Sequence, residues 1–398
     1  MSKPSQAVAG APRRRSVQKP GKRSHKKAAA LPPLSVTYAD AAGIDIGASS
    51  HFVAVPADRD AEPVREFAAF TDDLRRLVQW LRECRVTAVA MESTGVYWIP
   101  LYELLETEGF EVHLVNARHV KGLPGRKSDV LDCQWLQQLM SFGLLRGAFR
   151  PADNVCALRA VWRHRDMLLS YQSRHVQHLQ KALTQMNVQL HHVISDIMGV
   201  TGQAIVRAIV AGERDGRVLA RLRHRRIRAE EAEIARSLEG NWRAEHLFSL
   251  KQALALYDAY ASQIADCDVE VERRLGALEA HEVPPEALGG AQRKRPKNAP
   301  RFDAHKALFK AVGVDLTRIP GIEASSALKI ISEIGTDLRR FPTVKRLTSW
   351  LGLCPGTKIS GGKSLSGQTK RCANRAAQAL RMAAQSLRGC LESFGCRC

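Results

Sequence analysis

The first part of the chain changes repeatedly between apolar runs and alternating apolar and polar positions. Residues 43–46 (GIDI) are mostly apolar, and after a glycine-containing bend the segment HFVAV, residues 51–55, alternates in character. Two such segments separated by a turn predict a strand and a returning strand. REFAAF, residues 65–70, is expected to extend the same sheet as a third strand.

Helical segments and short apolar strands then alternate. A helix is expected over residues 72–84, behind an aspartate cap, because apolar residues recur at helical spacing: Leu74, Leu77, Val78 and Leu81. Residues 86–95 (VTAVAMESTG) predict a buried strand, residues 97–109 a helix that ends at Gly109, and residues 110–117 another strand. This order of elements predicts a mixed α/β sheet.

Between about residues 151 and 275 the strand patterns give way to a seven-residue repeat. One seam contains Leu169, Val176, Leu183 and Leu190, with Gln172, Leu179 and Met186 between them. A second seam contains Leu250, Leu254, Tyr257, Ala261, Ile264, Val271 and Leu275. The two seams predict a coiled-coil region of two long helices, which pair antiparallel within one chain or between two chains.

The C-terminal part has its own pattern. Residues 316–335 (LTRIPGIEASSALKIISEIG) place a Pro–Gly turn before an apolar helix that ends at Gly335. This pattern resembles a helix-hairpin-helix, whose turn offers N–H groups to a DNA phosphate, although an ordinary helical turn explains it almost as well. Residues 354–370 (CPGTKISGGKSLSGQTK) are expected to form a loop that leads into a helix.

These patterns predict a division of the chain into six parts. They are a basic tail (1–38), an α/β domain (39–150), a helical region (151–276), a linker (277–303), a mainly α C-terminal domain (304–390) and a short tail (391–398). A length of 398 residues is enough for two or three domains with separate cores.

The charge of the chain points to a polyanionic partner. The 60 Lys and Arg outnumber the 40 Asp and Glu, for a formal net charge of +20. Residues 1–33 hold nine Lys and Arg and no acid, and residues 338–391 hold eleven and no acid. Such a distribution favours nucleic acid as the partner. The N-terminal run on its own is typical of a disordered, solvated tail.

Cysteine usage and hydropathy indicate the cellular compartment of the protein. The nine cysteines are odd in number and contain no CxxC pair, so neither a disulfide framework nor a zinc site is predicted. The chain has no window of 18 or more apolar residues and no apolar segment after its basic N-terminus. A cytoplasmic location without membrane contact is therefore expected.

Four carboxylates stand out in this basic chain. Asp45 lies inside the first predicted strand, where burial is costly unless the charge is paired or binds metal. Glu92 ends another predicted strand, and Asp129 and Asp132 share one face of the helix expected to begin near Ser128. Together they suit two divalent ions roughly 4 Å apart that clamp the oxygens of a phosphoryl transfer. Their hard oxygen ligands favour Mg²⁺ or Mn²⁺.

Each of these acidic residues has a simpler explanation when it is considered alone. An Asp in a strand is more often a turn or edge residue, and a DxxD pair is more often a charge effect at a helix N-terminus. The order of all four residues on an α/β pattern is harder to explain in that way.

Three segments resemble the IS110 family of transposases, and within it the IS1111 subgroup. They are GIDIGASSHFVAV, AMESTGVYWIPLYELLETEGFEVHLVNARHVKGLPGRKSDVLDCQWL and the C-terminal run from RIPGIEASSALKIISEIG to CANRAAQAL. The similarity extends over roughly residues 40–390, with the motifs in the order of the family.

The resemblance implies a RuvC-like, RNase H-type domain with a DEDD tetrad of Asp45, Glu92, Asp129 and Asp132, which holds Mg²⁺ or Mn²⁺. It also implies a C-terminal transposase domain whose serine forms a covalent phosphoserine with DNA. Ser360, in KISGGK, matches the family's Ser-Gly position best, and Ser364 and Ser366 remain alternatives.

The resemblance further implies partners. IS110-like elements encode a structured non-coding RNA that pairs with donor and target DNA, and the family acts as a dimer that pairs into a tetramer at the synapse. The residues expected to contact nucleic acid are Lys127, Lys358, Gly361, Gly362, Lys363, Lys370, Arg371 and Arg375. Sequence specificity would then lie in base pairing, while the protein reads shape and charge.

Three functions follow from the residues and the resemblance. The first is a DNA transposase or recombinase with a metal-assisted serine nucleophile, because a serine hydroxyl needs a base or a metal to activate it. The second is a RuvC-like nuclease in which the tetrad activates water and Ser360 is dispensable. The third is a non-enzymatic nucleic-acid-binding protein with a structural acidic cluster.

Overall fold

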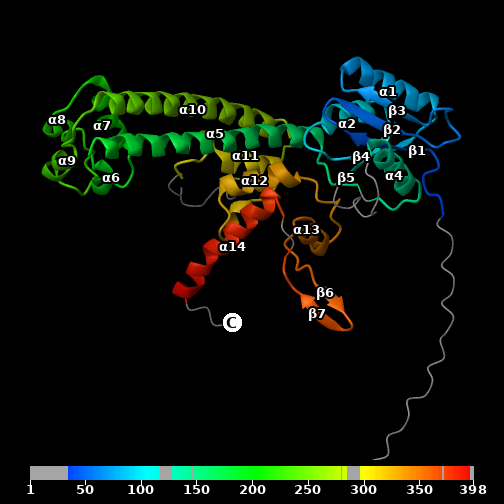
Figure 1. Cartoon of the computed structure of the whole chain (residues 1–398). Helices are drawn as coiled ribbons and strands as arrows, with labels where there is room; N and C mark the ends of the chain where they lie inside the picture. Colours follow the sequence, from blue (N-terminus) through cyan, green and yellow to red (C-terminus); the bar gives the residue numbers. More distant parts are fainter. Residues whose placement is uncertain are drawn as a thin grey trace, which may run out of the picture. The chain divides into compact units, whose positions relative to one another are not determined.

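The computed structural model describes residues 35–116, 128–145, 147–278, 280–284, 296–369 and 372–394. The chain divides into two compact units, residues 1–149 and residues 150–398 (Figure 1). The greater part of the predicted basic tail lies outside the described residues, as do parts of the predicted linker.

The first unit contains a five-stranded sheet in the order β3-β2-β1-β4-β5. Its strands are β1 (Ala41–Ile46), β2 (Ser50–Ala54), β3 (Val64–Ala68), β4 (Ala88–Glu92) and β5 (Glu111–Val115). β1, β2 and β3 are antiparallel neighbours, whereas β4 and β5 run parallel to β1. This is the mixed sheet of an RNase H-like domain, and the predicted fold class is confirmed.

Helices cover both faces of the sheet, and the two-residue period of the strands decides which side chains meet them. Ile44 of β1 and Met91 of β4 pack in one cluster with the helices α1 (Thr71–Glu83) and α2 (Trp98–Thr107). Ala41 and Ala90 pack in another cluster with Met140, which belongs to α4 (Asp129–Ser141). The predicted aspartate cap of α1 is wrong, because Phe70 is the N-cap residue and Asp72 and Asp73 lie in the first turn.

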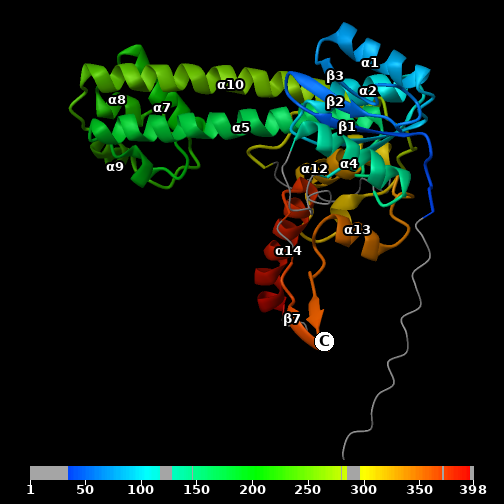
Figure 2. The ribbon, with the colours of Figure 1, turned by 45° about the vertical axis from the view of Figure 1, so that its right-hand side comes forward.

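The second unit is built on two long helices, α5 (Asp153–Gln185) and α10 (Ala244–Gly276), which lie side by side in both ribbon views (Figures 1 and 2). They run antiparallel within one chain, since Arg165 contacts Asp268 and the Gln172 amide donates a hydrogen bond to the Tyr257 carbonyl at 3.2 Å. The predicted coiled-coil pair is thus confirmed.

The first seam is shorter than its seven-residue repeat indicates. α5 ends at Gln185, because Asn187 adopts a positive φ of 58°. Leu190 therefore lies in the short helix α6 (Leu190–Val193) and not in the long helix. The helices α7 (Val200–Ala211), α8 (Gly216–Ala220) and α9 (Glu231–Ser237) follow, and their apolar residues share one core with Leu179 and Leu250 of the long helices.

The C-terminal residues pack against the other end of α5 and α10. This part contains α11 (Ala304–Val312), the 3₁₀ helix η2 (Leu316–Arg318), α12 (Ala324–Ile334), α13 (Val344–Trp350) and α14 (Arg375–Phe394). Leu158, Leu308 and Leu328 belong to one core cluster, which joins α5, α11 and α12. A Cβ atom on Gly321, in the Pro–Gly turn before α12, would lie 2.5 Å from the Ala383 carbonyl of α14, so this glycine has a packing role.

The predicted loop at residues 354–370 contains a β-hairpin. β6 (Lys358–Ser360) pairs antiparallel with β7 (Lys363–Ser366). Gly361 and Gly362 connect the strands with φ values of 56° and 78°. Two consecutive residues with positive φ match the twist of a two-residue hairpin, and glycine adopts them without strain. The predicted loop is therefore wrong in part, because the Gly361–Gly362 pair forms a hairpin turn between two exposed strands that carry no burial pattern.

No helix in the described ranges combines the length and the apolar composition needed to cross a bilayer.

Candidate active site

The period of β1 places Asp45 on the side of the sheet that faces α4. Ala41 packs with Met140 of α4, and Asp45 lies four residues later on the same face. The neighbouring Ile44 and Ile46 are buried on the opposite face, whereas Asp45 is half-buried. The strand therefore fixes the direction of this carboxylate through the burial of its neighbours.

The first turn of α4 supplies the other two aspartates. Ser128 is the N-cap residue, and its hydroxyl accepts a hydrogen bond from the Leu131 N–H at 3.3 Å. Asp129 and Asp132 follow within the first turn, where the helix dipole stabilises negative charge. Residues three apart are neighbours on a helix, so the cap aligns both carboxylates on one side.

Gly43 brings the helix onto the strand. A Cβ atom at this position would lie 2.2 Å from the Cys133 carbonyl oxygen and 2.3 Å from the Gln137 nitrogen, both in the backbone of α4. Only a glycine permits this approach. Because Gly43 is two residues from Asp45 on the same face, the close packing at Gly43 determines how far the first turn of α4 lies from that aspartate.

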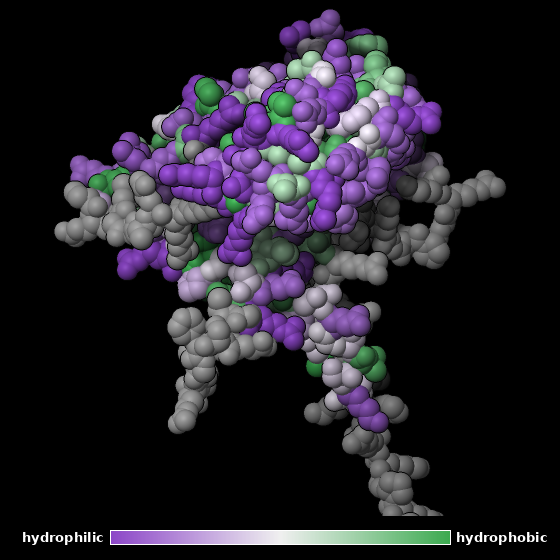
Figure 3. Space-filling model, turned by 90° about the vertical axis from the view of Figure 1, so that its left-hand side faces the viewer, coloured by the Kyte–Doolittle hydropathy of each residue, from purple (hydrophilic) through white to green (hydrophobic). Residues whose placement is uncertain are grey.

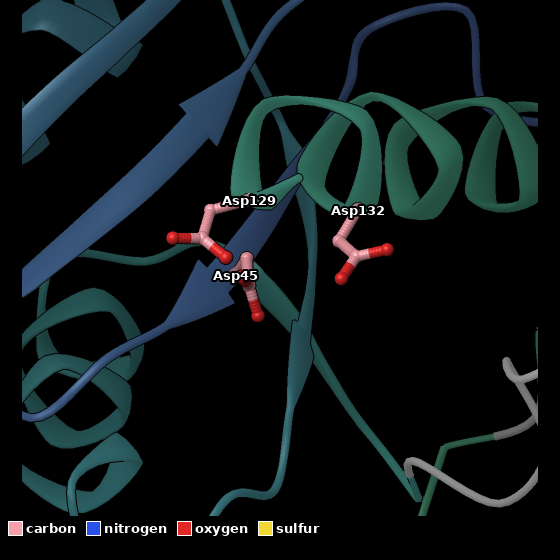
Figure 4. A group of neighbouring side chains, drawn as sticks. All are labelled: Asp45, Asp129 and Asp132. Atoms are coloured by element: carbon pink, nitrogen blue, oxygen red, sulfur yellow. The ribbon is translucent and has the colours of Figure 1, made fainter. Parts of the chain in front are cut away.

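The three aspartates meet as a result. Asp45, Asp129 and Asp132 each offer a carboxylate oxygen, and these oxygens all lie within 4.8 Å of one another (Figure 4). Asp129 is exposed, whereas Asp132, like Asp45, is half-buried. An accessible set of hard oxygen donors fits a divalent cation better than it fits a soft metal. The cluster and the domain type are consistent with binding of a divalent metal ion.

Glu92 lies one strand away on the same face. The register pairs Ile44 with Met91, so Glu92, the last residue of β4, extends beside Asp45. Its carboxylate accepts a hydrogen bond from the Thr94 hydroxyl at 3.1 Å, and it is not a member of the close carboxylate group. The structure therefore brings together three of the four predicted acidic residues and places the fourth on the adjacent strand end.

A buried thiol lies beneath the acidic cluster. Cys133 of α4 is fully buried, and its Sγ donates to the Val130 carbonyl at 3.1 Å. Burial raises the pKa of this thiol to about 12, and the negative charges of Asp45 and Asp132 act in the same direction. Cys133 is therefore a packing residue that keeps its proton at neutral pH.

Ser360 belongs to the second unit, at the end of β6, and its side chain is exposed. It pairs with Lys363 across the Gly361–Gly362 turn. The turn is open, since a Cβ atom on either glycine would meet no atom within 4 Å. Of the alternatives, Ser364 is exposed, and the Ser366 hydroxyl accepts a hydrogen bond from the Gln368 N–H at 3.3 Å.

The other predicted contact residues divide into three groups. Lys363 is exposed in β7, and Lys358 lies in β6. Arg375 begins α14 and lies 3.9 Å from Asp166, which also pairs with Lys329 at 2.9 Å, so it has a structural partner. The remaining predicted residues, Lys127, Lys370 and Arg371, lie outside the described residues.

Sequence reasoning missed two residues that position the site. Gly43 was included in a strand without a role, although the small residues Ala41, Ala42 and Gly43 signal close helix packing. Thr94, which donates to Glu92, was included in the predicted strand over residues 86–95 without a role. Its position two residues after a strand-end carboxylate is a weak signal, and no spacing rule would have identified it.

Comparison with protein families gives two matches. The DEDD transposase model of the IS110 type, described as a transposase, matches residues 42–188, and a second model, described as the transposase IS116/IS110/IS902 family, matches residues 301–392. A search of curated proteins finds no match. Together the two matches cover more than half of the chain and include all the carboxylates described above and Ser360. The chain belongs to the IS110 family of insertion-sequence transposases, which are enzymes that act on DNA.

Proposed function

We propose that this transposase cuts and rejoins DNA strands at the ends of its insertion sequence through a serine nucleophile assisted by Mg²⁺ or Mn²⁺. The observation that carries the proposal is the convergence of Asp45, Asp129 and Asp132, whose oxygens lie within 4.8 Å of one another. A chain with a net charge of +20 concentrates negative charge at this point, where a cation would be held against a phosphate.

Asp45, Asp129 and Asp132 would hold the metal, with Glu92 joining from the adjacent strand end. A bound divalent ion would neutralise charge on the phosphate oxygens and lower the cost of ionising the nucleophile. In this proposal Ser360 loses its hydroxyl proton and its Oγ forms a bond to phosphorus. The bond from phosphorus to a sugar oxygen breaks, and that oxygen takes up a proton and leaves as a hydroxyl. Attack by the same hydroxyl group or by another DNA end reverses the step and releases the serine.

The hairpin suits this role for Ser360. The Ser360 side chain is exposed beside two glycines that carry no Cβ atoms, so a phosphate can approach the backbone closely. Lys363, the cross-strand partner of Ser360, would attract the phosphate. Gly361, Gly362 and Lys358 complete the proposed contact, with Lys127, Lys370, Arg371 and Arg375 as further candidates.

We also propose that an element-encoded structured RNA supplies sequence specificity and that the active form is a dimer that pairs into a tetramer at the synapse. The support is the family membership together with the strong positive charge. The IS1111 subgroup stays a prediction. In this arrangement the protein binds phosphate backbones while base pairing selects the site.

The metal site is tested by cleavage of end-labelled element-junction DNA in the presence of the RNA and Mg²⁺. Asp129→Asn removes one charge and keeps the shape, so we expect a cleavage rate lower on the order of 100-fold with DNA binding retained. Asp58→Asn is the matched control, because Asp58 is exposed on the same unit and pairs only weakly with Arg59 at 3.4 Å. Equal cleavage by both variants, or cleavage in excess chelator, would refute the metal site.

A further inference from the structure

The end of the long-helix pair carries an unusual concentration of arginine. Residues 217–228 contain six arginines and a histidine, but no lysine and no acid. The arginines of this segment, here called the arginine segment, are Arg217, Arg221, Arg223, Arg225, Arg226 and Arg228. The segment lies between the two family matches, at residues that neither of them covers.

The backbone of the arginine segment is held in place. The His224 N–H donates to the hydroxyl of Thr201, a buried residue of α7, at 2.8 Å. Ile227 packs against the core that α7, α8 and α9 share, and its N–H donates to the His224 carbonyl at 2.9 Å. The arginines are therefore presented by an ordered surface.

Most of these arginines have no acidic partner. Arg223 pairs with Glu231 at 3.7 Å, whereas Arg221, Arg225, Arg226 and Arg228 are exposed and form no ion pair within the described part of the chain. Some other exposed arginines are paired, as Arg207 is with Asp258 at 2.7 Å. Figure 3 views the molecule from this end, and the face nearest the viewer is mostly hydrophilic. Four unpaired cations so close together repel one another, and an external polyanion would remove that cost.

The chemistry of the segment selects a class of ligand. Guanidinium groups bind phosphate oxygens through two parallel hydrogen bonds, which explains the use of arginine without lysine. Single strands are usually held by stacked aromatic rings, but the only Phe, Tyr or Trp between residues 186 and 243 is Trp242, and Arg214 lies over its ring at 5.1 Å. The surface therefore fits the backbone of a double helix better than unstacked bases.

We propose that the arginine segment is a separate nucleic-acid contact that binds the phosphate backbone of a double helix without reading its sequence. It would hold duplex DNA or a duplex stem of RNA away from the catalytic residues. This inference rests on the nucleic-acid role of the proposed function, but not on the metal cluster or on Ser360.

The test measures binding of the chain to two labelled duplexes of random sequence and equal length, one of DNA and one of RNA. The protein is first freed of nucleic acid and is kept in chelator. The variant Arg225→Ala, Arg226→Ala, Arg228→Ala removes three exposed charges. We expect about tenfold or greater loss of affinity near physiological salt, and a slope of log affinity against log salt that is shallower by about 2 to 3 for DNA. Because these side chains form no ion pair with the residues that the structure describes, thermal unfolding should not change.

A matched control separates a local contact from a general loss of charge. Arg75→Ala, Arg76→Ala, Arg82→Ala removes the same charge from α1, where each arginine is paired with a carboxylate. The ligand is identified by the duplex, DNA, RNA or both, for which the triple variant of the arginine segment loses more affinity than the α1 variant does. Equal affinities and salt slopes for the two triple variants on both duplexes overturn the proposal. Since chelator prevents metal-dependent cleavage, this outcome is independent of whether Asp129→Asn or Ser360→Ala affects the reaction.

Discussion

One face of β1 provides both close packing of a helix, at Gly43, and a carboxylate of the acidic cluster, at Asp45. Gly43 has no side chain, so that the backbone of α4 can lie directly on β1, and Asp45 extends two residues further along the same face. The proximity of Asp45 to Asp129 and Asp132 depends on that close packing. The positions of the three carboxylates are thus fixed by a residue that has no functional group.

We expect Gly43→Ala to disrupt the carboxylate cluster. The added Cβ would overlap backbone atoms of Cys133 and Gln137, and relief of such overlap typically costs about 1–3 kcal/mol of unfolding free energy. Denaturant unfolding measures this loss, and the rise in thermal stability with added Mg²⁺ should shrink. Gly276→Ala is the control, since a Cβ atom there would meet nothing within 4 Å. Equal stabilities of the two variants would contradict the packing role of Gly43.

Cys133 predicts a dependence of stability on alkaline pH. Its pKa is raised by burial from 9.0 to about 12, so between these values the native chain keeps a proton that the unfolded chain releases. Stability from this group is complete below pH 9 and is lost as pH rises toward about 12. The stability difference between wild type and Cys133→Ala should therefore shrink from pH 8 to pH 10. A constant difference, or rapid alkylation of Cys133 at neutral pH, would show that the thiol is not buried.

At the scale of elements, α5 and α10 are joined by one ion pair that is almost completely buried. Arg165 and Asp268 are each 2 % exposed, and the Arg165 Nε lies 2.5 Å from a carboxylate oxygen. Arg165 also donates to the Asn298 carbonyl at 3.1 Å, and Asp268 accepts from the Arg301 N–H at 3.0 Å. The pair therefore connects both long helices with the segment that leads to α11.

Asp268→Asn should be strongly destabilising. It leaves a buried guanidinium without its counter-charge, which typically costs about 3–5 kcal/mol. Asp258→Asn breaks the exposed pair with Arg207 on the same helix, and we expect a loss below about 1 kcal/mol. Chemical unfolding of both variants gives the comparison. If Asp268→Asn costs no more than Asp258→Asn, the pair does not hold the helices together.

The elements whose side chains repeat regularly could be predicted from the sequence, because burial on one face imposes a period. The five strands of the sheet and the two long helices are of this kind. The end of α5 at Gln185 was missed, because the local left-handed conformation of Asn187 outweighs a repeat that continues to Leu190. The hairpin around Ser360 was missed because its exposed strands carry no burial pattern.

The candidate site could likewise be predicted only in part from the sequence. The four carboxylates were selected from their strand and helix positions, and three of them converge. Their convergence depends on long-range packing of α4 at Gly43, which no local period encodes. The role of Ser360 came from the family resemblance, since nothing in its local sequence identifies a base.

At the scale of the whole molecule, the proposed reaction uses both compact units. The carboxylate cluster belongs to residues 1–149, and Ser360 belongs to residues 150–398. The carboxylates alone would support a nuclease that uses water, and Ser360 has no histidine or carboxylate near it in the sequence to activate it. The proposed reaction therefore requires the carboxylates and Ser360 to act in one step.

The most direct test is to look for a covalent adduct between the protein and DNA. Purified protein is incubated with Mg²⁺, the element's RNA and end-labelled junction DNA, then denatured and resolved by size, with Ser360→Ala compared to Ser364→Ala and Ser366→Ala. We predict an adduct in wild type and in the two control variants that disappears in Ser360→Ala and in Asp129→Asn. DNA cleavage without any adduct, unchanged in Ser360→Ala, would contradict the serine mechanism and leave a metal-dependent nuclease that uses water.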